Sequence, residues 1–294
     1  MNSFKEKFIK AIFCVIGFSS LLFLLAIVVS LFKGSCLSLT DINQLTFLFS
    51  SDWAPYYDPA EYGILSLIIS SVFVSLVAGL ICVPLGLGTA LYLYELAGSK
   101  QRKILKPVIE ILSGIPSIVF GFFGLAVLAP FMRSALRLPS GLCVLTAAII
   151  LGVMTIPVIT SIAEDALSFV PKSFREASYA LGGNRWQTLI KVIVPAAASG
   201  ISTSVILAIS RIMGETMIVL MIAGGATAIP TSLFSPARPM TSTIAAEMGE
   251  AAYGSLHFSA LFEIGLILFF ITLILNYIAE KISKKYRLKL GHGR

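Results

Sequence analysis

Two opposite charges stand inside an otherwise uncharged stretch of the chain. Arg211 and Glu215 are the charged residues of segment 192–223, and their spacing of four places them on one face if the segment is a helix. A charge near the centre of a bilayer costs at least about 2.5–3.5 kcal/mol, so it faces a bundle interior or a watery path. The guanidinium of Arg211 can hold an oxyanion with two hydrogen bonds while Glu215 orients it. The alternative is a purely structural ion pair that locks helices together.

Three hydroxyl side chains are weaker candidates for the same path. Ser113 and Ser117 flank the helix-breaking sequence Gly114-Ile115-Pro116, where freed backbone amides can meet a passing anion. The competing interpretation is a break that only serves helix packing. Thr216 follows Glu215 directly, and it either offers its hydroxyl to the path or bonds back to its own helix.

The elements that carry these residues belong to a membrane protein. Hydrophobic residues make up 57% of the 294-residue chain and charged residues 13%, whereas about 25% is usual in globular proteins. A soluble fold could not hide so much apolar side chain. The net charge of +7 comes from basic residues at the ends of hydrophobic runs, which indicates membrane orientation rather than nucleic-acid binding.

Several kinds of chemistry lack the residues they need. Two histidines and four scattered cysteines without a CxxC pair give neither a metal site nor a disulfide framework. The chain has no GxxxxGKS or GxxxxGKT sequence, so it has no P-loop for a nucleotide. It also lacks a nucleophile elbow and an HExxH motif. We therefore expect no cofactor in this chain and no enzymatic activity of its own.

Six hydrophobic runs are candidates to cross a bilayer core of roughly 30 Å as helices, although the last one is shorter and relies on Leu261 and Phe262 to extend it upstream. The first run competes with a signal peptide, but it is longer than the apolar core of such a peptide, which has about 7–15 residues. Proline and glycine within the later runs are tolerated where neighbouring helices satisfy the freed backbone groups. The six runs are 11–32, 63–94, 111–132, 138–163, 192–223 and 264–279.

The distribution of positive charge predicts the orientation of these spans. Of the 22 Lys and Arg residues, 17 lie in the N-terminal segment, in residues 95–107 and 164–191, and in the tail that begins at Lys281. Only four lie in the segments on the opposite side of the membrane. The chain therefore has both termini in the cytoplasm by the positive-inside rule.

The loops at the two membrane faces carry further polar and aromatic residues. On the inner side, we expect Glu164 and Asp165 to form a solvated helix end. On the outer side, Trp53, Tyr56 and Tyr57 are typical of an interfacial aromatic belt, with a binding patch as the alternative.

The inner loop 171–195 is amphipathic. Apolar residues such as Phe174 and Leu181 alternate with charged ones, and Gly182-Gly183-Asn184 is a helix stop and turn. The pattern predicts a helix, a turn, and a second helix over 185–194. Exposed apolar side chains on such a loop suit docking into a partner's groove and lying at the lipid interface equally well.

The same loop resembles the EAA motif of bacterial ABC importer permeases. The match consists of Glu176-Ala177-Ser178, with serine in place of the second alanine, followed by Gly182, Ile193 and Pro195. This resemblance implies that the loop is a coupling helix that fits a cleft in a cytoplasmic ATPase subunit. The residues to which it assigns coupling are Arg175, Glu176, Ala177, Ala180 and Gly182.

From residue 50 to 280 the chain resembles one branch of these permeases, the PstC-type subunits of phosphate importers. Two segments favour that branch, Trp53-Ala54-Pro55 and Ala246-Glu247-Met248-Gly249-Glu250-Ala251. The segment Arg211-Ile212-Met213-Gly214-Glu215-Thr216 also matches, although PstA-type permeases share it. Further matches are Tyr62-Gly63-Ile64-Leu65, Val83-Pro84-Leu85-Gly86, and Gly114-Ile115-Pro116-Ser117 with Gly121.

The resemblance implies an all-α, polytopic permease with six transmembrane helices and the MetI-like fold, in the bacterial cytoplasmic membrane. Residues 1–62 would form the first helix and an outer loop, 63–280 the permease domain, and 281–294 a basic cytoplasmic tail. The implied partners are a PstA-like second permease, a cytoplasmic ATPase dimer that binds ATP and Mg, an extracytoplasmic phosphate-binding protein and the lipid bilayer. The family also implicates an Arg and a Glu of this segment in phosphate transport, here Arg211 and Glu215.

Three alternatives stay open on the residues alone. One is a permease for another oxyanion, such as sulfate or molybdate. Another is a secondary anion transporter or channel that needs no ATPase and uses Arg211 as its anion site. A third is a membrane scaffold that senses phosphate and carries no flux.

Overall fold

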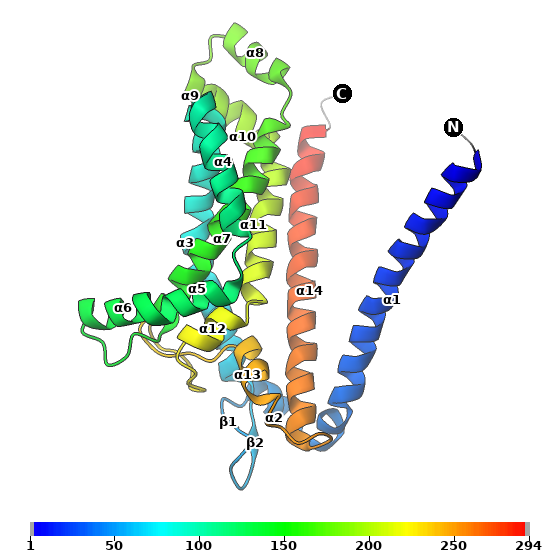
Figure 1. The fold of residues 1–294 in the computed structure, drawn as a ribbon, viewed down its shortest axis with the longest axis vertical. Coiled ribbons are helices and arrows are strands. Elements are labelled where there is room, and N and C mark those ends of the chain that lie inside the picture. The colour runs from blue at the N-terminus through cyan, green and yellow to red at the C-terminus, as the bar shows by residue number, and fades with distance from the viewer. Residues whose placement is uncertain (1–2, 292–294) are drawn as a thin grey trace.

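The computed structural model of this chain describes residues 3–291, and the side chains of residues 8–278, 280 and 281. Its long helices run along the bundle and shorter ones close the two ends (Figure 1). A small antiparallel hairpin pairs β1 (Trp53–Ala54) with β2 (Glu61–Tyr62). The helices are α1 (Ser3–Asp41), α2 (Gln44–Phe49), α3 (Leu65–Leu91), α4 (Ser99–Ser113), α5 (Ser117–Phe123), α6 (Ala129–Ala135), α7 (Val144–Ser168), α8 (Lys172–Ala180), α9 (Arg185–Thr188), α10 (Val194–Ala196), α11 (Ala198–Met213), α12 (Met217–Ile222), α13 (Met240–Glu247) and α14 (Leu256–Gly291). Single π-helical turns cover Tyr92–Leu96, Gly124–Leu128 and Leu189–Ile193.

The number of membrane-length helices agrees with the six predicted runs. Within the described residues, five helical segments are long and apolar enough to cross a bilayer, and one bent pair passes the test jointly as a sixth. The bent pair joins Arg185–Ala196 to Ala198–Met213 at an angle of 68°. The five single segments are Phe8–Asp41, Leu65–Leu96, Ser117–Ala135, Val144–Ser168 and Leu256–Ile278.

The fifth predicted run, 192–223, is not one helix. Its first part bends at Ala197, two residues after Pro195, which has no backbone N–H to continue the hydrogen-bond ladder. Helix α11 then ends at Met213, and α12 begins at Met217 after three intervening residues. Gly214, the poorest helix former after proline, occupies the end of α11.

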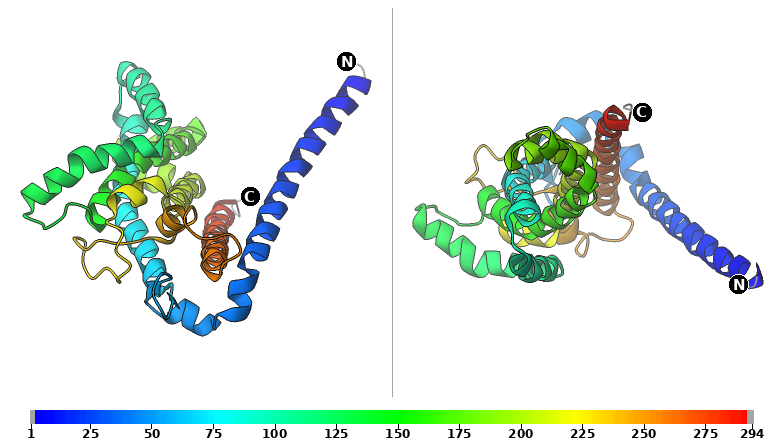
Figure 2. Two further views of the ribbon diagram at one scale, coloured as in Figure 1. Left: turned by 60° about the horizontal axis from the view of Figure 1, so that its bottom comes forward. Right: turned by 90° about the horizontal axis from the view of Figure 1, so that it is seen from above.

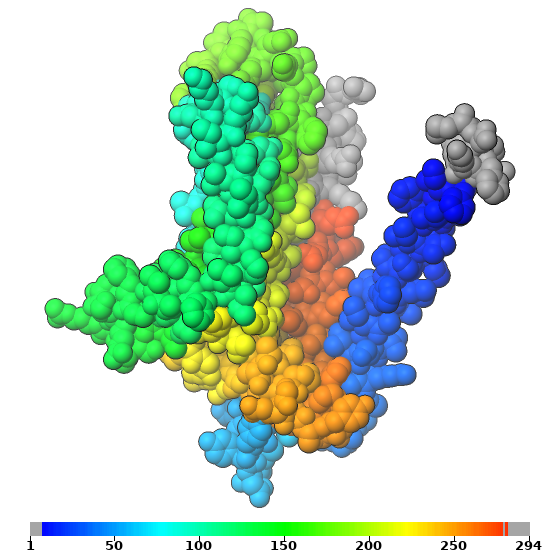
Figure 3. Space-filling model, in the orientation of Figure 1, coloured from blue at the N-terminus to red at the C-terminus, as the bar shows by residue number. Residues whose placement is uncertain are grey.

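The third predicted run, 111–132, also contains a break. Helix α4 ends at Ser113, and Pro116 stands directly before the first residue of α5. From there α5, a π-helical turn and α6 form a continuous arm that leaves the bundle sideways, which is visible in the ribbon and in the space-filling view (Figures 1 and 3). The break therefore lets α4 follow the bundle while the arm takes a new direction.

The centre of the bundle is the contact between α3 and α7. A Cβ atom added to Gly86 of α3 would lie 2.8 Å from Cβ of Ile159, and one added to Gly152 of α7 would lie 3.0 Å from Cγ2 of Ile81. The Thr160 hydroxyl also donates to the Gly86 carbonyl at 3.2 Å. Small residues and interhelical hydrogen bonds are the usual means by which membrane helices approach closely. This pair provides the rigid support for the flanking α11 and α12.

The two ends of the bundle differ in what they carry. Helices α8 and α9 and both described ends of the chain point toward one end, while the hairpin, α2 and α13 lie at the other (Figure 1). The assignment of the first end to the cytoplasm stays a prediction. Of the predicted tail 281–294, all side chains after Lys281 lie outside those that the structure describes.

Helix α1 is attached to the rest of the chain near its C-terminal end. The Ser38 amide donates to Ser259 Oγ of α14 at 2.9 Å, and Ser259 Oγ donates to the Gly34 carbonyl at 2.8 Å. Toward its N-terminus α1 stands apart from the bundle in each view (Figures 1 and 2). Most of its described side chains before Lys33 are therefore exposed.

The predicted aromatic belt is wrong for one of its three residues. Trp53 is buried, 4% exposed, and its indole N–H donates to the Glu247 carboxylate at 3.0 Å. Tyr56 and Tyr57, in the same hairpin, are exposed. Trp53 therefore anchors the hairpin to the bundle, whereas the two tyrosines stay available at the surface.

Candidate functional site

Arg211 and Glu215 do not form the predicted helical pair. Arg211 lies in the last turn of α11, while Glu215 lies beyond the end of that helix. No ion pair or hydrogen bond between their side chains exists in the described part of the chain. The i, i+4 geometry requires a continuous helix, and the chain leaves the helix at Gly214.

The break itself is held by local hydrogen bonds. Glu215 accepts from the Met217 amide through Oε1 at 3.1 Å, so its carboxylate caps the start of α12. The Thr216 hydroxyl lies 3.5 Å from the Gly214 carbonyl, at the limit of a hydrogen bond. Glu215 and Thr216 are both half-buried. They therefore shape the backbone of the break more than they face open space.

Arg211, in contrast, is exposed and has no partner among the described residues. It shares one uncovered face of α11 with Thr203 and Leu207, which precede it at intervals of four residues. A guanidinium is always charged and has five N–H donors, so this site can accept an anion without breaking an existing ion pair. The face between Thr203 and Arg211 is the candidate substrate path.

The two predicted serines have different environments. The Ser113 hydroxyl donates to the Glu110 carbonyl of its own helix at 2.7 Å. Ser117 opens α5 and is half-buried, and its hydroxyl has no hydrogen-bond partner within the described residues. Helix α5 packs closely on α12, since a Cβ added to Gly121 would lie 2.8 Å from Met221 Sδ. Ser117 thus belongs to a helix that borders the break, and Ser113 is engaged elsewhere.

The loop 171–195 contains the predicted helix, turn and second helix. Gly182 has φ +82°, which a glycine adopts without strain, and it turns the chain out of α8. Asn184 caps α9 by accepting from the Gln187 amide at 2.8 Å, while Gln187 Oε1 accepts from the Asn184 amide at 3.0 Å. Ser178 and Thr188 share a hydrogen bond of 2.8 Å between the two helices. The loop is therefore a folded unit.

The surface of this loop is open and largely apolar. Phe174 and Leu181 are 49% and 89% exposed. Between the helices lies a hollow of about 660 Å³, to which Ala177 and Ser178 contribute. Large exposed apolar side chains around a hollow are typical of a protein-docking surface.

The predicted coupling residues do not all lie on that surface. Glu176, Ala177, Ala180 and Gly182 are exposed. Arg175 instead points inward, where its Nη2 lies 2.5 Å from Glu95 Oε2 and its guanidinium lies over the Tyr94 ring at 5.2 Å. Arg175 thus contacts its own bundle, and four of the five residues form the outward face.

Glu95 joins the whole loop to the bundle. This buried carboxylate sits in the π-helical turn at the end of α3 and receives Arg175 from α8 and Arg185 from α9, the latter at 2.6 Å from Nε to Oε1. Arg185 Nη2 also donates to the Glu95 carbonyl. One residue of the π-helical turn that follows α3 therefore binds both helices of the loop, so a displacement of the loop reaches the end of α3 directly.

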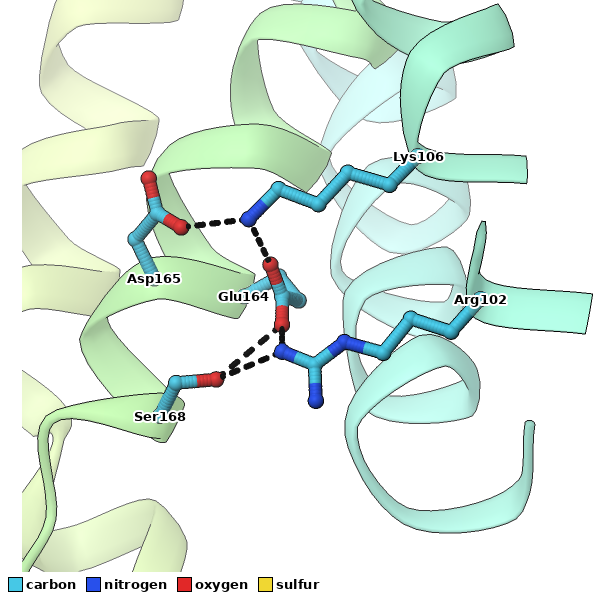
Figure 4. A network of polar contacts seen from close by, with 5 residues as sticks. All are labelled: Arg102, Lys106, Glu164, Asp165 and Ser168. Carbon is cyan, nitrogen blue, oxygen red and sulfur yellow. Dashed lines mark hydrogen bonds and ion pairs between the residues drawn. The ribbon is translucent and has the colours of Figure 1, made fainter. Parts of the chain in front are cut away.

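Glu164 makes a second buried network, and the expectation of a solvated helix end is wrong for it (Figure 4). Its carboxylate accepts from Arg102 and from Lys106 Nζ at 2.8 Å, and Ser168 Oγ donates to it at 3.0 Å. Lys106 also lies 2.8 Å from Asp165, which is exposed. Hydrogen bonds to Asp165 and then Glu164 raise the pKa of Lys106 above its usual value. The network ties α4 to the C-terminal end of α7, directly before the loop 171–195.

Sequence reasoning missed Glu95 and the role of Glu164 because their partners are far away along the chain. One usable signal exists, since Arg102 and Lys106 are four residues apart on α4 and so share a helix face. Two cationic side chains on one helix face near a hydrophobic run predict a carboxylate side chain on a neighbouring helix. The sequence alone does not say which acid that is.

Comparison with known proteins gives the same kind of molecule throughout. The model of the family "binding-protein-dependent transport system inner membrane component" matches residues 82–288. The chain is 41% identical over 244 residues to a probable ABC transporter permease, YqgH of Bacillus subtilis (strain 168), and the match covers 82% of this chain and 79% of the relative. It is 37% identical over 284 residues to the phosphate transport system permease PstC of Mesorhizobium japonicum, covering 90% and 86%.

Solved structures of ABC transporters share the fold. A bacterial alginate ABC transporter, in complex with a pentasaccharide-bound periplasmic protein, superimposes with a TM-score of 0.66 at 12% identity, covering 97% of this chain and 98% of that one. The inward-facing methionine transporter MetNI gives a TM-score of 0.59 at 21% identity, covering 74% and 93%. At these identities the likeness concerns the fold alone.

Proposed function

We infer that this chain, which belongs to the family of binding-protein-dependent transport system inner membrane components, is the permease subunit of an ATP-driven importer for inorganic phosphate. It is a multi-pass protein of the cytoplasmic membrane. Phosphate as the substrate follows from its similarity to several PstC phosphate permeases over most of the chain. The chain is a transport subunit rather than an enzyme, and a separate subunit hydrolyses ATP with Mg.

The observation that carries the proposal within this molecule is Arg211 on α11, which is exposed and has no partner among the residues that the structure describes. An arginine in a membrane helix is costly unless it meets water or an anion, and its fork matches a phosphate oxygen pair. Phosphate would pass this face when the helix is accessible from one side and then from the other. The Glu215 carboxylate, held at the Met217 amide, keeps a negative charge beyond the break, which disfavours tight trapping of the anion.

Coupling to ATP would run through the loop 171–195. One subunit of a cytoplasmic ATPase dimer would dock on Glu176, Ala177 and Ala180, the outward face of α8. Because Arg175 and Arg185 both bind Glu95, movement of the docked loop would displace the end of α3. The outward side of the loop would therefore bind the ATPase, and its inward side would pass the movement to the end of α3.

Other subunits would complete the transporter complex. The uncovered face of α11 calls for a second permease, which we propose to be PstA-like, because a single chain leaves Arg211 open to lipid. An extracytoplasmic phosphate-binding protein would deliver the anion to the end that carries the hairpin and α13. Both chain termini would lie in the cytoplasm, in accordance with the charge distribution.

Uptake of radiolabelled phosphate by vesicles tests the function. The vesicles contain this chain with its co-purifying partners, and the assay is run with and without ATP and binding protein. We expect uptake that needs both and that excess sulfate or molybdate does not compete away. Uptake driven by an ion gradient alone would mean a secondary transporter. ATP hydrolysis stimulated only by another oxyanion's binding protein would keep the class and replace the substrate.

A further inference from the structure

Three separate parts of the chain meet at the carboxylate of Glu247, the last residue of α13. Trp53 of the hairpin donates its indole N–H to both oxygens, at 3.1 and 3.0 Å. Arg238, which precedes α13, lies 2.7 Å from Oε1, and His257 Nε2 of α14 lies 2.8 Å from Oε2. Glu247 is 4% exposed, so these partners replace water almost completely.

Trp53 and Glu247 belong to the two segments on which the resemblance to PstC-type permeases rests, Trp53-Ala54-Pro55 and the segment 246–251. They are 194 residues apart in the chain and adjacent in the fold. Helix capping and membrane anchoring explain neither residue. Their shared role is to fix the hairpin and α13 to each other.

The opposite end of α13 reaches the break beside Arg211. The Thr241 hydroxyl donates to the Glu215 carbonyl at 2.8 Å, and the Met240 amide donates to Ser71 Oγ of α3 at 2.9 Å. Both Thr241 and Met240 are buried. Helix α13 therefore spans from the outer hairpin, through the Glu247 cluster, to the backbone that follows Arg211.

Because α13 is bound at both ends, a displacement of one end also displaces the other. An amide in place of the Glu247 carboxylate would leave one acceptor oxygen for the three side chains that now share two, and it would leave Arg238 without its counter-charge. Both changes favour rearrangement of that end. The rearrangement would reach Glu215 through Thr241, because the interior packing leaves little room for independent movement.

We propose that Glu247 is a positioning residue of the substrate path: through α13 and Thr241 it fixes the Glu215 backbone and so the direction in which Arg211 meets the anion. The proposal rests on the proposed function of Arg211. It assigns to the segment 246–251 a task on the outer side of the path, distinct from coupling to ATP at the other end of the bundle.

The test measures phosphate transported per ATP hydrolysed by the reconstituted complex, with binding protein present. The variants are Glu247→Gln and Thr241→Val, which keep side-chain size and remove the charge or the hydroxyl donor. We expect the ratio to fall about tenfold for Glu247→Gln and less for Thr241→Val, in the range of coupling changes made away from a ligand. Glu250→Gln, at an exposed glutamate of the same segment that contacts Tyr56 of the hairpin and not the Glu247 carboxylate, serves as the matched control and should keep the ratio.

A purely structural role gives a different pattern. In that case Glu247→Gln lowers the yield or thermal stability of the complex, while the phosphate-to-ATP ratio of the surviving complex is unchanged, and the proposal is overturned. If Glu247→Gln fails to assemble, Thr241→Val decides by the same ratio. If Arg211→Gln itself keeps the full ratio, the proposed function fails, whatever Glu247 does.

Discussion

The charged groups at the end of the bundle that carries the loop 171–195 and the charged group on α11 have opposite surroundings. Glu95 and Glu164 are buried, and each is bound by two cationic side chains from other elements. Arg211 is exposed and has no partner within the described residues. All three lie in or beside helices of membrane length.

The difference separates charges that assemble this chain from a charge that serves something outside it. A buried carboxylate that lost its cations would be unpaired in a medium of low dielectric constant, so the fold supplies the cations itself. Arg211, which is unpaired within the described part of the chain, retains its capacity to bind an anion. The buried, paired Glu95 and Glu164 therefore hold the helices of this chain together. The exposed Arg211, which has no partner among the described residues, lies on the candidate substrate path.

Replacing Arg211 by Gln should have the largest effect on transport. Glutamine keeps a polar side chain but loses the charge and the bidentate fork, and two charge-assisted hydrogen bonds together are worth roughly 3 kcal/mol, or about 100-fold in rate. Phosphate uptake by reconstituted complex should fall by about that factor, while size-exclusion chromatography shows intact assembly. If the complex falls apart instead, Arg211 is a structural residue like Glu95 and Glu164, and it is not a substrate-binding one.

Glu176→Lys should act at the other end of the molecule, on docking. Glu176 is exposed on the outward face of α8, so the change reverses a charge without disturbing the bundle. We expect about a tenfold loss of ATPase co-purification and of uptake together, as for a rim charge of an interface. The matched variant Arg175→Gln removes an inward contact and should leave co-purification higher than Glu176→Lys does. Unchanged uptake in Glu176→Lys would remove the docking assignment.

Glu164→Ala should reduce stability more than transport chemistry. The change leaves Arg102 and Lys106 without their buried acceptor, but both cations are partly exposed and water screens them. We expect a loss of about 2 kcal/mol, seen as a lower midpoint of thermal unfolding of the purified complex. A variant with an unchanged midpoint would show that the Glu164 network does not stabilise the folded chain.

Asp165→Asn should have the smallest effect, because Asp165 is exposed and exposed pairs contribute about 0–1 kcal/mol. The raised pKa of Lys106 gives the contribution a pH window. The pairing is fully present below the ordinary lysine pKa of 10.5 and is lost as pH rises through the higher folded value. The difference in unfolding midpoint between the wild type and this variant should therefore be constant from pH 7 to 9. A difference that varies over that range would contradict the pairing.

Much of the architecture follows from the length of hydrophobic runs. A run that exceeds the bilayer thickness has to be helical, whichever neighbours it has, so six membrane-length units were predictable. The turn at Gly182-Gly183-Asn184 was also predictable, because its cause is local: a glycine at positive φ followed by a capping asparagine.

What the sequence left undetermined depends on contacts between distant segments. Hydrophobicity does not reveal where α11 ends, since the hydrophobic run 192–223 continues on both sides of Gly214. The pairing of Glu164 with Arg102 joins residues 62 positions apart, and that of Trp53 with Glu247 joins residues 194 apart. An isolated tryptophan in an outer loop carries the same local signal whether it anchors in lipid headgroups or donates to a buried carboxylate.

Accessibility of the Arg211 face in the assembled complex tests the central claim most directly. In a background with Cys14 and Cys36 replaced by Ser, Leu207→Cys places a thiol on the uncovered face of α11, one turn before Arg211, and Ala208→Cys places one in the buried core. We predict that a charged, water-soluble thiol reagent labels position 207 and not position 208, and that phosphate-loaded binding protein with ATP changes the rate at 207. If position 207 stays unlabelled in every state, the face is sealed by lipid or protein, and Arg211 does not line the path.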